Sequence, residues 1–302
     1  MTATPIIAVA NQKGGVGKTT TALNLAACLA ERRHRILLID LDPQANSTSG
    51  LGIEKQPGRS SYRALLGEAP MAESIVKTAM DRLDLVPSEL DLAGAEVDIA
   101  RGDRYLHRFK EAVAPLAAAG QYDFIIVDCP PSLGILTMNA LTAAESLLIP
   151  IQCEYYALEG LSVITRLVRQ LHDSGANTAL QIEGIVLTMY DMRTNLSQQV
   201  VQEVLNHFGD KVYESLIPRS VRLSEAPSFG KPIILYDKHC TGAAAYRQLA
   251  REFLKRRKGG AESPIEEEQA AIPEPAPVSP PAEVPAPPPA PDSPAVVPDT
   301  PS

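Results

Sequence analysis

Short apolar runs alternate along the chain with stretches in which apolar residues recur every three or four positions. The runs are rich in Val, Ile and Leu, and several are unbroken, which is typical of strands buried on both faces of a parallel sheet. They occupy residues 6–10, 36–39, 83–86, 124–127, 147–151, 182–189 and 212–217. This alternation predicts an α/β fold, with a mostly parallel, twisted sheet, right-handed crossovers and helices on both faces.

The helices are predicted from apolar residues at helical spacing. The first follows the first strand, where apolar residues recur at positions 23, 26, 27 and 30. Further helices are expected within residues 62–66, 102–119, 158–171, 197–208 and 242–258. Residues 46–50 have the composition of a polar loop, and residues 217–232, with three prolines, that of a rigid, exposed loop.

A glycine-rich segment, NQKGGVGKTT at residues 11–20, joins the first strand to the first helix. In such a turn, backbone N–H groups converge at the positive end of the helix dipole and form a phosphate cradle. Lys18 adds a cation for the terminal phosphates, and the Thr19 hydroxyl is a ligand for Mg²⁺. The segment departs from the standard phosphate loop because it has Gln12 in place of the first glycine and a second lysine, Lys13, beside it.

Aspartates stand where two of the apolar runs end. Asp40 and Asp42 follow the second run, and Asp128 follows the fourth. Carboxylates at the carboxyl ends of parallel strands face the ligand crevice of an open α/β sheet. Asp128 therefore has the Walker B arrangement, which holds Mg²⁺ through its water shell. Asp40 and Asp42 are candidates for holding Mg²⁺ or positioning a water molecule, and the alternative is that they cap the turn before Pro43.

Composition changes abruptly near the C-terminus of this 302-residue chain. Residues 259–302 contain fourteen of the 26 prolines and eight acidic residues, without lysine or arginine. We therefore predict a folded domain over residues 1–258 and a disordered, acidic, Pro-rich tail over residues 259–302. The net charge of −8 belongs to this tail, since the remaining residues carry 28 basic and 28 acidic groups. Any affinity for nucleic acid must come from a local basic patch.

Cysteine spacing and hydropathy exclude several classes of protein. The four cysteines and five histidines are scattered without the spacing of a disulfide framework or a metal site, which predicts isolated buried thiols in a reducing cytosol. No apolar run approaches 18 residues, so no transmembrane helix is expected. The N-terminus lacks the features of a signal peptide.

The form K-G-G-x-G-K-T resembles the "deviant" Walker A box of the ParA/MinD class of P-loop ATPases. Residues 39–44, I-D-L-D-P-Q, are similar to the A-prime motif of that class. The run D-C-P-P-S at 128–132 and the elements I-P-R, S-E-A-P and G-K-P within 217–232 resemble further motifs of it. The resemblance covers about residues 5–257. It implies a P-loop NTPase fold, ATP and Mg²⁺ as cofactors, and weak intrinsic ATPase activity.

The resemblance also implies roles for individual residues. Lys13, Lys18 and Asp42 would be catalytic: Lys13 would reach the ATP of a second subunit in a sandwich dimer, and Asp42 would orient the attacking water. Residues implied to bind nucleotide are Lys13, Gly14, Gly15, Val16, Gly17, Lys18, Thr19, Thr20, Pro218 and Arg219, the last two against the adenine. Residues implied to hold the metal are Thr19, Asp40 and Asp128. Arg193 and Arg222 match positions that bind DNA without sequence preference. On the sequence alone, two such arginines are more often solvated or ion-paired. The alternative for the 217–232 segment is a rigid surface loop alone.

Within this class, the ParA/Soj chromosome- or plasmid-partitioning branch fits best. It implies an ATP-dependent homodimer, non-specific binding to double-stranded DNA, stimulation by a ParB-type centromere-binding protein, and a cytoplasmic, nucleoid-associated location. The alternative is a MinD-like membrane-cycling regulator, because the last predicted helix is basic and amphipathic. Nothing apolar continues past Leu254, which argues against that alternative. A metabolic switch or kinase on the same fold would need an acceptor site that no element of the sequence suggests.

Overall fold

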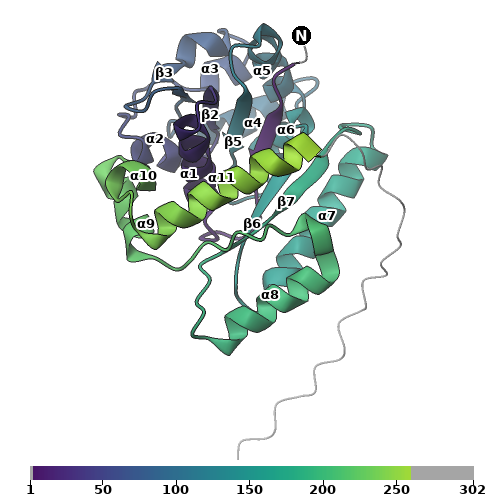
Figure 1. The fold of residues 1–302 in the computed structure, drawn as a ribbon. Coiled ribbons are helices and arrows are strands. Elements are labelled where there is room, and N and C mark those ends of the chain that lie inside the picture. The colour runs from purple at the N-terminus through teal and green to yellow at the C-terminus, as the bar shows by residue number, and fades with distance from the viewer. Residues whose placement is uncertain (1–2, 260–302) are drawn as a thin grey trace, which may run out of the picture. The chain divides into compact units, whose positions relative to one another are not determined.

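Seven strands form one sheet in the order β3-β4-β2-β5-β1-β6-β7 (Figure 1). The computed structural model describes residues 3–259, and neighbouring strands in it are parallel except β3 with β4. The strands are β1 (Ile6–Val9), β2 (Ile36–Asp40), β3 (Val76–Lys77), β4 (Leu83–Val86), β5 (Phe124–Asp128), β6 (Ser146–Gln152) and β7 (Gln181–Thr188). The predicted mostly parallel sheet is confirmed. The predicted tail lies outside the described residues except for Gly259.

Both faces of this sheet are buried, as its continuous apolar strands require. In β1, Ile6 and Ala8 belong to one hydrophobic cluster, and Ile7 and Val9 belong to the other. Successive side chains of a strand point to opposite faces, so each face needs its own layer of helices. The long helices α1 and α11 cover one face, and α4 to α8 cover the other (Figure 1).

Eleven α-helices and three 3-10 turns connect or follow the strands in the described part of the chain. The α-helices are α1 (Lys18–Glu31), α2 (Asn46–Gly50), α3 (Tyr62–Leu65), α4 (Leu92–Ala100), α5 (Arg108–Ala119), α6 (Ile135–Ala143), α7 (Ala157–Asp173), α8 (Asn195–Phe208), α9 (Val221–Glu225), α10 (Ile233–Tyr236) and α11 (Thr241–Gly259). The 3-10 turns are η1 (Met71–Ser74), η2 (Gly209–Lys211) and η3 (Ala226–Phe229).

Residues 212–217 do not form the predicted strand. Their segment runs beside β7 and meets it in one isolated bridge, between Val212 and Ile185. The N–H groups of Tyr213 and Ile217 also donate to carbonyl oxygens of β7. The carboxylate of Glu252 on α11 accepts the N–H groups of Glu214 and Ser215, at 2.9 and 3.0 Å. Because a side chain takes these donors, a regular ladder with β7 does not form.

Two segments predicted as loops contain short helices. Residues 46–50 form α2, and residues 221–229 form α9 and η3 in succession. Leu223 and Ala226 in the second segment are buried, so it is not wholly exposed. The two segments pack on each other through α2 and η3, and α2 also packs on α1. This tertiary contact favours helical turns that the local composition does not predict.

Candidate functional site

The loop between β1 and α1 has the backbone conformation that its glycines allow. Gly15 and Gly17 have φ of +75° and +85°, and Gly17 is the cap residue that precedes α1. A residue with a Cβ is strained in this left-handed region. The first N–H groups of a helix lack partners within it, so they are available to an anion. All predicted cradle residues from Gly14 to Thr20 lie in this loop or in the first turn of α1.

Two polar side chains tie the loop to the sheet. The Thr188 hydroxyl at the end of β7 lies 2.9 Å from the carbonyl oxygen of Val16 and 3.0 Å from that of Ile151. The Asn11 side-chain amide donates to the carbonyl of Pro150 at 2.8 Å. These bonds hold the loop at the carboxyl ends of β6 and β7, so the cradle has a fixed place on the sheet.

Lys18 is a buried cation inside the loop. Its side chain is only 6% exposed, and its Nζ donates to the carbonyl oxygen of Lys13 at 2.9 Å. Burial lowers the pKa of Lys18, whereas the nearby carboxylate of Asp128 acts in the opposite direction. A cation held at this depth is suited to an anionic ligand, because a buried charge is costly without a counter-charge.

Lys13 is engaged within its own chain. Its Nζ lies 2.7 Å from Oε2 of Glu154, in the segment that follows β6, and its backbone N–H donates to Oδ1 of Asn11. Both side chains of this ion pair are nearly half exposed, at 46% and 42%. An ion pair this exposed contributes about 0–1 kcal/mol, so it is easily exchanged for another partner.

Asp40 and Asp128 lie side by side, because they are register partners at the ends of β2 and β5. Both are completely buried. Burial raises the pKa of Asp40 to about 7, although hydrogen bonds from Thr48 and from the Asp42 N–H act to lower it. Burial and then the neighbouring Asp40 raise the pKa of Asp128 well above its usual range, while Ser47 and Thr19 act in the opposite direction. A positive ion beside this pair would favour the charged forms.

Asp42 lies two residues further along and is 6% exposed. Its Oδ1 accepts the N–H of Gln44 at 2.9 Å. This bond stabilises the turn at Pro43, as the alternative role of a turn-capping aspartate expects. Its carbonyl oxygen accepts the Ser88 hydroxyl at 2.6 Å. The structure therefore brings Asp40, Asp42 and Asp128 to one edge of the sheet, next to the Lys18 ammonium. Asp42 and Asp128 act directly on the pKa of Lys18.

Sequence analysis missed Ser47 and Thr48 on α2. The Ser47 hydroxyl donates to Oδ2 of Asp128 at 2.8 Å, and the Thr48 hydroxyl donates to Oδ2 of Asp40 at 2.7 Å. The available signal was the run of small polar residues at 46–50 directly after the strand-end aspartates, which we interpreted as a loop.

The residues beside Lys18 fit a magnesium ion. Oδ1 of Asp128 is buried and has no hydrogen-bond partner, and Thr19 faces the same carboxylate. Within residues 3–259, no group of three or more His, Cys, Asp or Glu side chains is arranged to ligate a metal alone. Mg²⁺ is usually bound through one or two carboxylates, with water and phosphate oxygens as its other ligands. Asp40 has both oxygens engaged, so its part in metal binding stays a prediction.

Pro218 and Arg219 lie beside the end of β7. Pro218 forms an isolated bridge with Tyr190, and the Arg219 N–H donates to the Tyr190 carbonyl at 3.0 Å. Tyr190 follows Thr188, which contacts the phosphate loop through Val16. This placement puts both residues on the side of the loop that β7 borders, and their contact with adenine stays a prediction.

The two predicted DNA-binding arginines are both ion-paired. The Arg193 guanidinium bonds to both oxygens of Asp191, at 2.9 and 2.7 Å, and its side chain is 83% exposed. The Arg222 guanidinium lies 3.1 Å from Glu225 and 3.6 Å from Asp237, and it is 55% exposed. Their role with DNA stays a prediction, and any phosphate would compete with these acids.

Basic residues near the end of α11 make structural contacts. Arg256 bonds to Glu252 and to the carbonyl of Val212, and Arg257 bonds to Glu183 at 2.6 Å. Arg257 therefore helps to attach α11 to β7, and Arg256 helps to attach it to the segment that begins at Val212. In the part of the chain that the structure describes, no helix is both long and apolar enough to cross a membrane.

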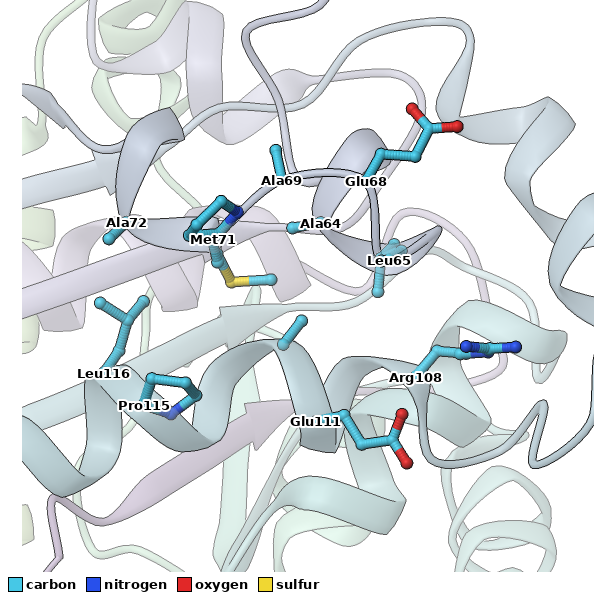
Figure 2. A pocket seen from close by; sticks show the side chains of 13 residues that line it. Ala64, Leu65, Glu68, Ala69, Met71, Ala72, Arg108, Glu111, Pro115 and Leu116 are labelled. Carbon is cyan, nitrogen blue, oxygen red and sulfur yellow. The ribbon is translucent and has the colours of Figure 1, made fainter.

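A cavity lies away from the phosphate loop, between α3, η1 and α5 (Figure 2). Its volume is about 440 Å³ and its lining is mainly apolar, with Met71, Pro115 and Leu116 among the side chains. The charged side chains of Glu68, Arg108 and Glu111 also line it. It contains none of the residues predicted to bind nucleotide, metal or DNA.

The comparisons with known proteins agree with this arrangement. The model of a family described as an AAA domain matches residues 4–182. The chromosome partitioning protein ParA of Caulobacter vibrioides is 50% identical over 261 residues, which cover 85% of this chain and 97% of that protein. The sporulation initiation inhibitor protein Soj of Bacillus subtilis is 55% identical over 248 residues, covering 82% and 97%.

A solved structure extends the similarity to the fold. Cobyrinic acid a,c-diamide synthase from Mycobacterium smegmatis, crystallised with ADP and magnesium, superimposes with a TM-score of 0.74 at 37% identity, covering 86% of this chain and 98% of that one. High identity over most of both chains, together with the phosphate loop and its strand-end carboxylates, establishes the family. The chain belongs to the ParA/Soj family of chromosome-partitioning proteins.

Proposed function

We propose that this protein is a DNA-partitioning ATPase, which hydrolyses ATP to ADP and phosphate with weak intrinsic turnover. The observation that carries the proposal is the buried Lys18 ammonium in the phosphate loop, beside the Asp128 carboxylate whose Oδ1 has no partner. The names of the relatives support the partitioning role. The ADP and magnesium bound to the structural neighbour support the choice of ligands.

Phosphoryl transfer requires positioning and charge stabilisation, without a covalent group from the protein. Lys18 and the N–H groups of the loop would hold the terminal phosphates of ATP. Magnesium, when bound by Thr19 with Asp128 behind its water shell, would neutralise phosphate charge. Asp42 would accept a hydrogen bond from the attacking water and fix its direction.

Lys13 would join two copies of the chain. In this structure it bonds to Glu154 within one chain, at a nearly half-exposed site. A phosphate group carries more negative charge than one carboxylate, so a second ATP-loaded copy offers Lys13 a stronger partner. We therefore propose that ATP transfers Lys13 from Glu154 to the nucleotide of the second copy and forms a homodimer.

The dimer would bind double-stranded DNA through Arg193 and Arg222, without sequence preference. Both arginines face acids of their own chain, so binding exchanges a carboxylate for a phosphate. Contacts to phosphate supply affinity but no base information. A ParB-type partner would accelerate hydrolysis and release the DNA, and the protein would act in the cytoplasm on the nucleoid.

The deciding experiment measures ATP-dependent binding to unrelated DNA duplexes over a range of salt concentrations. We expect binding that needs ATP, shows no sequence preference, and weakens linearly with the logarithm of salt concentration. The Lys13→Gln variant should bind ATP but form no ATP-dependent dimers on sizing chromatography. Vesicles of anionic lipid are tested in parallel. ATP-dependent pelleting with vesicles, in the absence of DNA binding, would replace this proposal with the MinD-like alternative.

A further inference from the structure

The buried carboxylates Asp40 and Asp128 are held in unequal ways by α2. Asp40 accepts three bonds: Oδ2 from the N–H and hydroxyl of Thr48, at 2.8 and 2.7 Å, and Oδ1 from the N–H of Asp42 at 3.1 Å. Asp128 accepts one, from the Ser47 hydroxyl to Oδ2 at 2.8 Å, and its Oδ1 has none. Asp40 is therefore satisfied within the chain, and Asp128 has one oxygen left for a group from outside.

Ser47 determines which oxygen of Asp128 is left. An aspartate carboxylate rotates about its terminal bond over a broad range of angles, so burial alone does not select one orientation. Ser47 is completely buried, and its hydroxyl fixes Oδ2 on the α2 side. Oδ1 is then the oxygen without a partner, in a carboxylate that Thr19 and Lys18 both influence.

Close contacts at two glycines restrict the position of α2. A Cβ on Gly50 would lie 2.8 Å from a methyl group of Leu23 on α1, and a Cβ on Gly230 would lie 2.6 Å from the Cα of Gly52. Both separations are well inside van der Waals contact. Because α1 and the turn after η3 approach this closely, they restrict any shift of α2 and of the turn that follows it.

We propose that Ser47 is a positioning residue for the metal-shell carboxylate: it orients Asp128 so that Oδ1 faces the magnesium water shell. This inference rests on the proposed function, because it presumes that Mg²⁺ accompanies the nucleotide. Hydrogen-bonding partners of metal-binding groups typically change metal affinity by about 10- to 100-fold when they are removed.

The test measures the binding of a fluorescent ADP analogue as MgCl₂ is titrated, and again in EDTA. For Ser47→Ala we expect the magnesium midpoint to rise at least about tenfold, with metal-free binding unchanged. Ser47→Thr keeps the hydroxyl and should restore the midpoint. Ser49→Ala is the matched control, since Ser49 is on the same helix but is exposed and contacts the Ala45 carbonyl. Ser47→Cys, a close match in size with a weak donor, replaces the alanine variant if that variant does not fold.

Two results would overturn the inference. One is an unchanged magnesium midpoint in both Ser47→Ala and Ser47→Cys. The other is an equal loss of ADP binding with and without magnesium, because that indicates a purely structural role. In an Asp128→Asn background, Ser47→Ala should raise the magnesium midpoint little further, because Ser47 acts through Asp128. A full additional effect in that background would also contradict the inference. A wild-type protein that binds no nucleotide would instead refute the proposed function.

Discussion

The ion pair between Lys13 and Glu154 leads to a prediction about the threshold of the proposed dimer switch. In the variant Glu154→Gln, the charge that holds Lys13 in its own chain is removed. The contact between Gln152 and Oε1 of residue 154 is kept, because a glutamine also presents an acceptor oxygen there. Lys13 should then be released more readily to the nucleotide of a second copy.

The magnitude follows from the exposure of the pair. The two charges lie 2.7 Å apart, but the side chains are 46% and 42% exposed, so water screens the attraction strongly. Such pairs are worth about 0.2–1 kcal/mol, which corresponds to a change of at most about fivefold in an equilibrium constant. The ATP concentration for half-maximal dimerisation should therefore fall by up to about fivefold in low salt. The difference should vanish in 1 M salt, where the Debye length is about 3 Å.

Analytical ultracentrifugation across an ATP series measures this threshold. The Asp42→Ala substitution is included in every sample so that hydrolysis does not deplete the nucleotide. Glu159→Gln is the matched control, because it removes the same charge from an exposed position in the first turn of α7. A threshold that rises in Glu154→Gln would refute the reasoning, since it would mean that Glu154 contributes to the dimer and does not oppose it.

Three further predictions concern hydrolysis, DNA binding and packing. Asp42→Ala should keep ATP and DNA binding while steady-state phosphate release falls at least about 100-fold, as for other water-positioning groups; normal turnover would remove the role of Asp42. Arg193→Ala should weaken ATP-dependent DNA binding equally for unrelated duplexes. It should also reduce by about 1 the slope of log binding constant against log salt concentration. Asp191→Asn frees the arginine and should strengthen DNA binding. Gly230→Ala should lower the free energy of unfolding by about 1–3 kcal/mol in urea titrations, because the added methyl collides with the Gly52 backbone; an unchanged unfolding midpoint would contradict this close packing.

Periodicity and composition predicted the central part of this molecule well. A parallel strand that is buried on both faces must be apolar throughout, so runs such as residues 36–39 and 124–127 are visible in the sequence. The aspartates that end these runs lie together because parallel strands finish at one edge of the sheet. The phosphate loop is equally visible, since its glycines are demanded by the local backbone, as the positive φ of Gly15 and Gly17 shows.

The failures occurred where a distant side chain decides the local structure. Residues 212–217 have the pattern of a strand, but Glu252 takes two of their N–H groups. Residues 46–50 have the pattern of a loop, but they form α2 against the carboxylates of Asp40 and Asp128. A pattern within ten residues contains no information about a partner that comes from another element, so these outcomes were not predictable from it.

The sequence by itself determined the layered α/β sheet, the phosphate loop and the strand-end carboxylates, because each leaves a local pattern in the chain: apolar runs, a glycine-rich turn, and aspartates where runs end. Only the tertiary structure decided which partners those groups have. Lys13 is paired with Glu154, 141 residues away, and Asp128 with Ser47, 81 residues away. The physical reason is that hydrogen bonds and ion pairs act over about 3 Å in space, so the fold must first bring together residues that are remote in the chain.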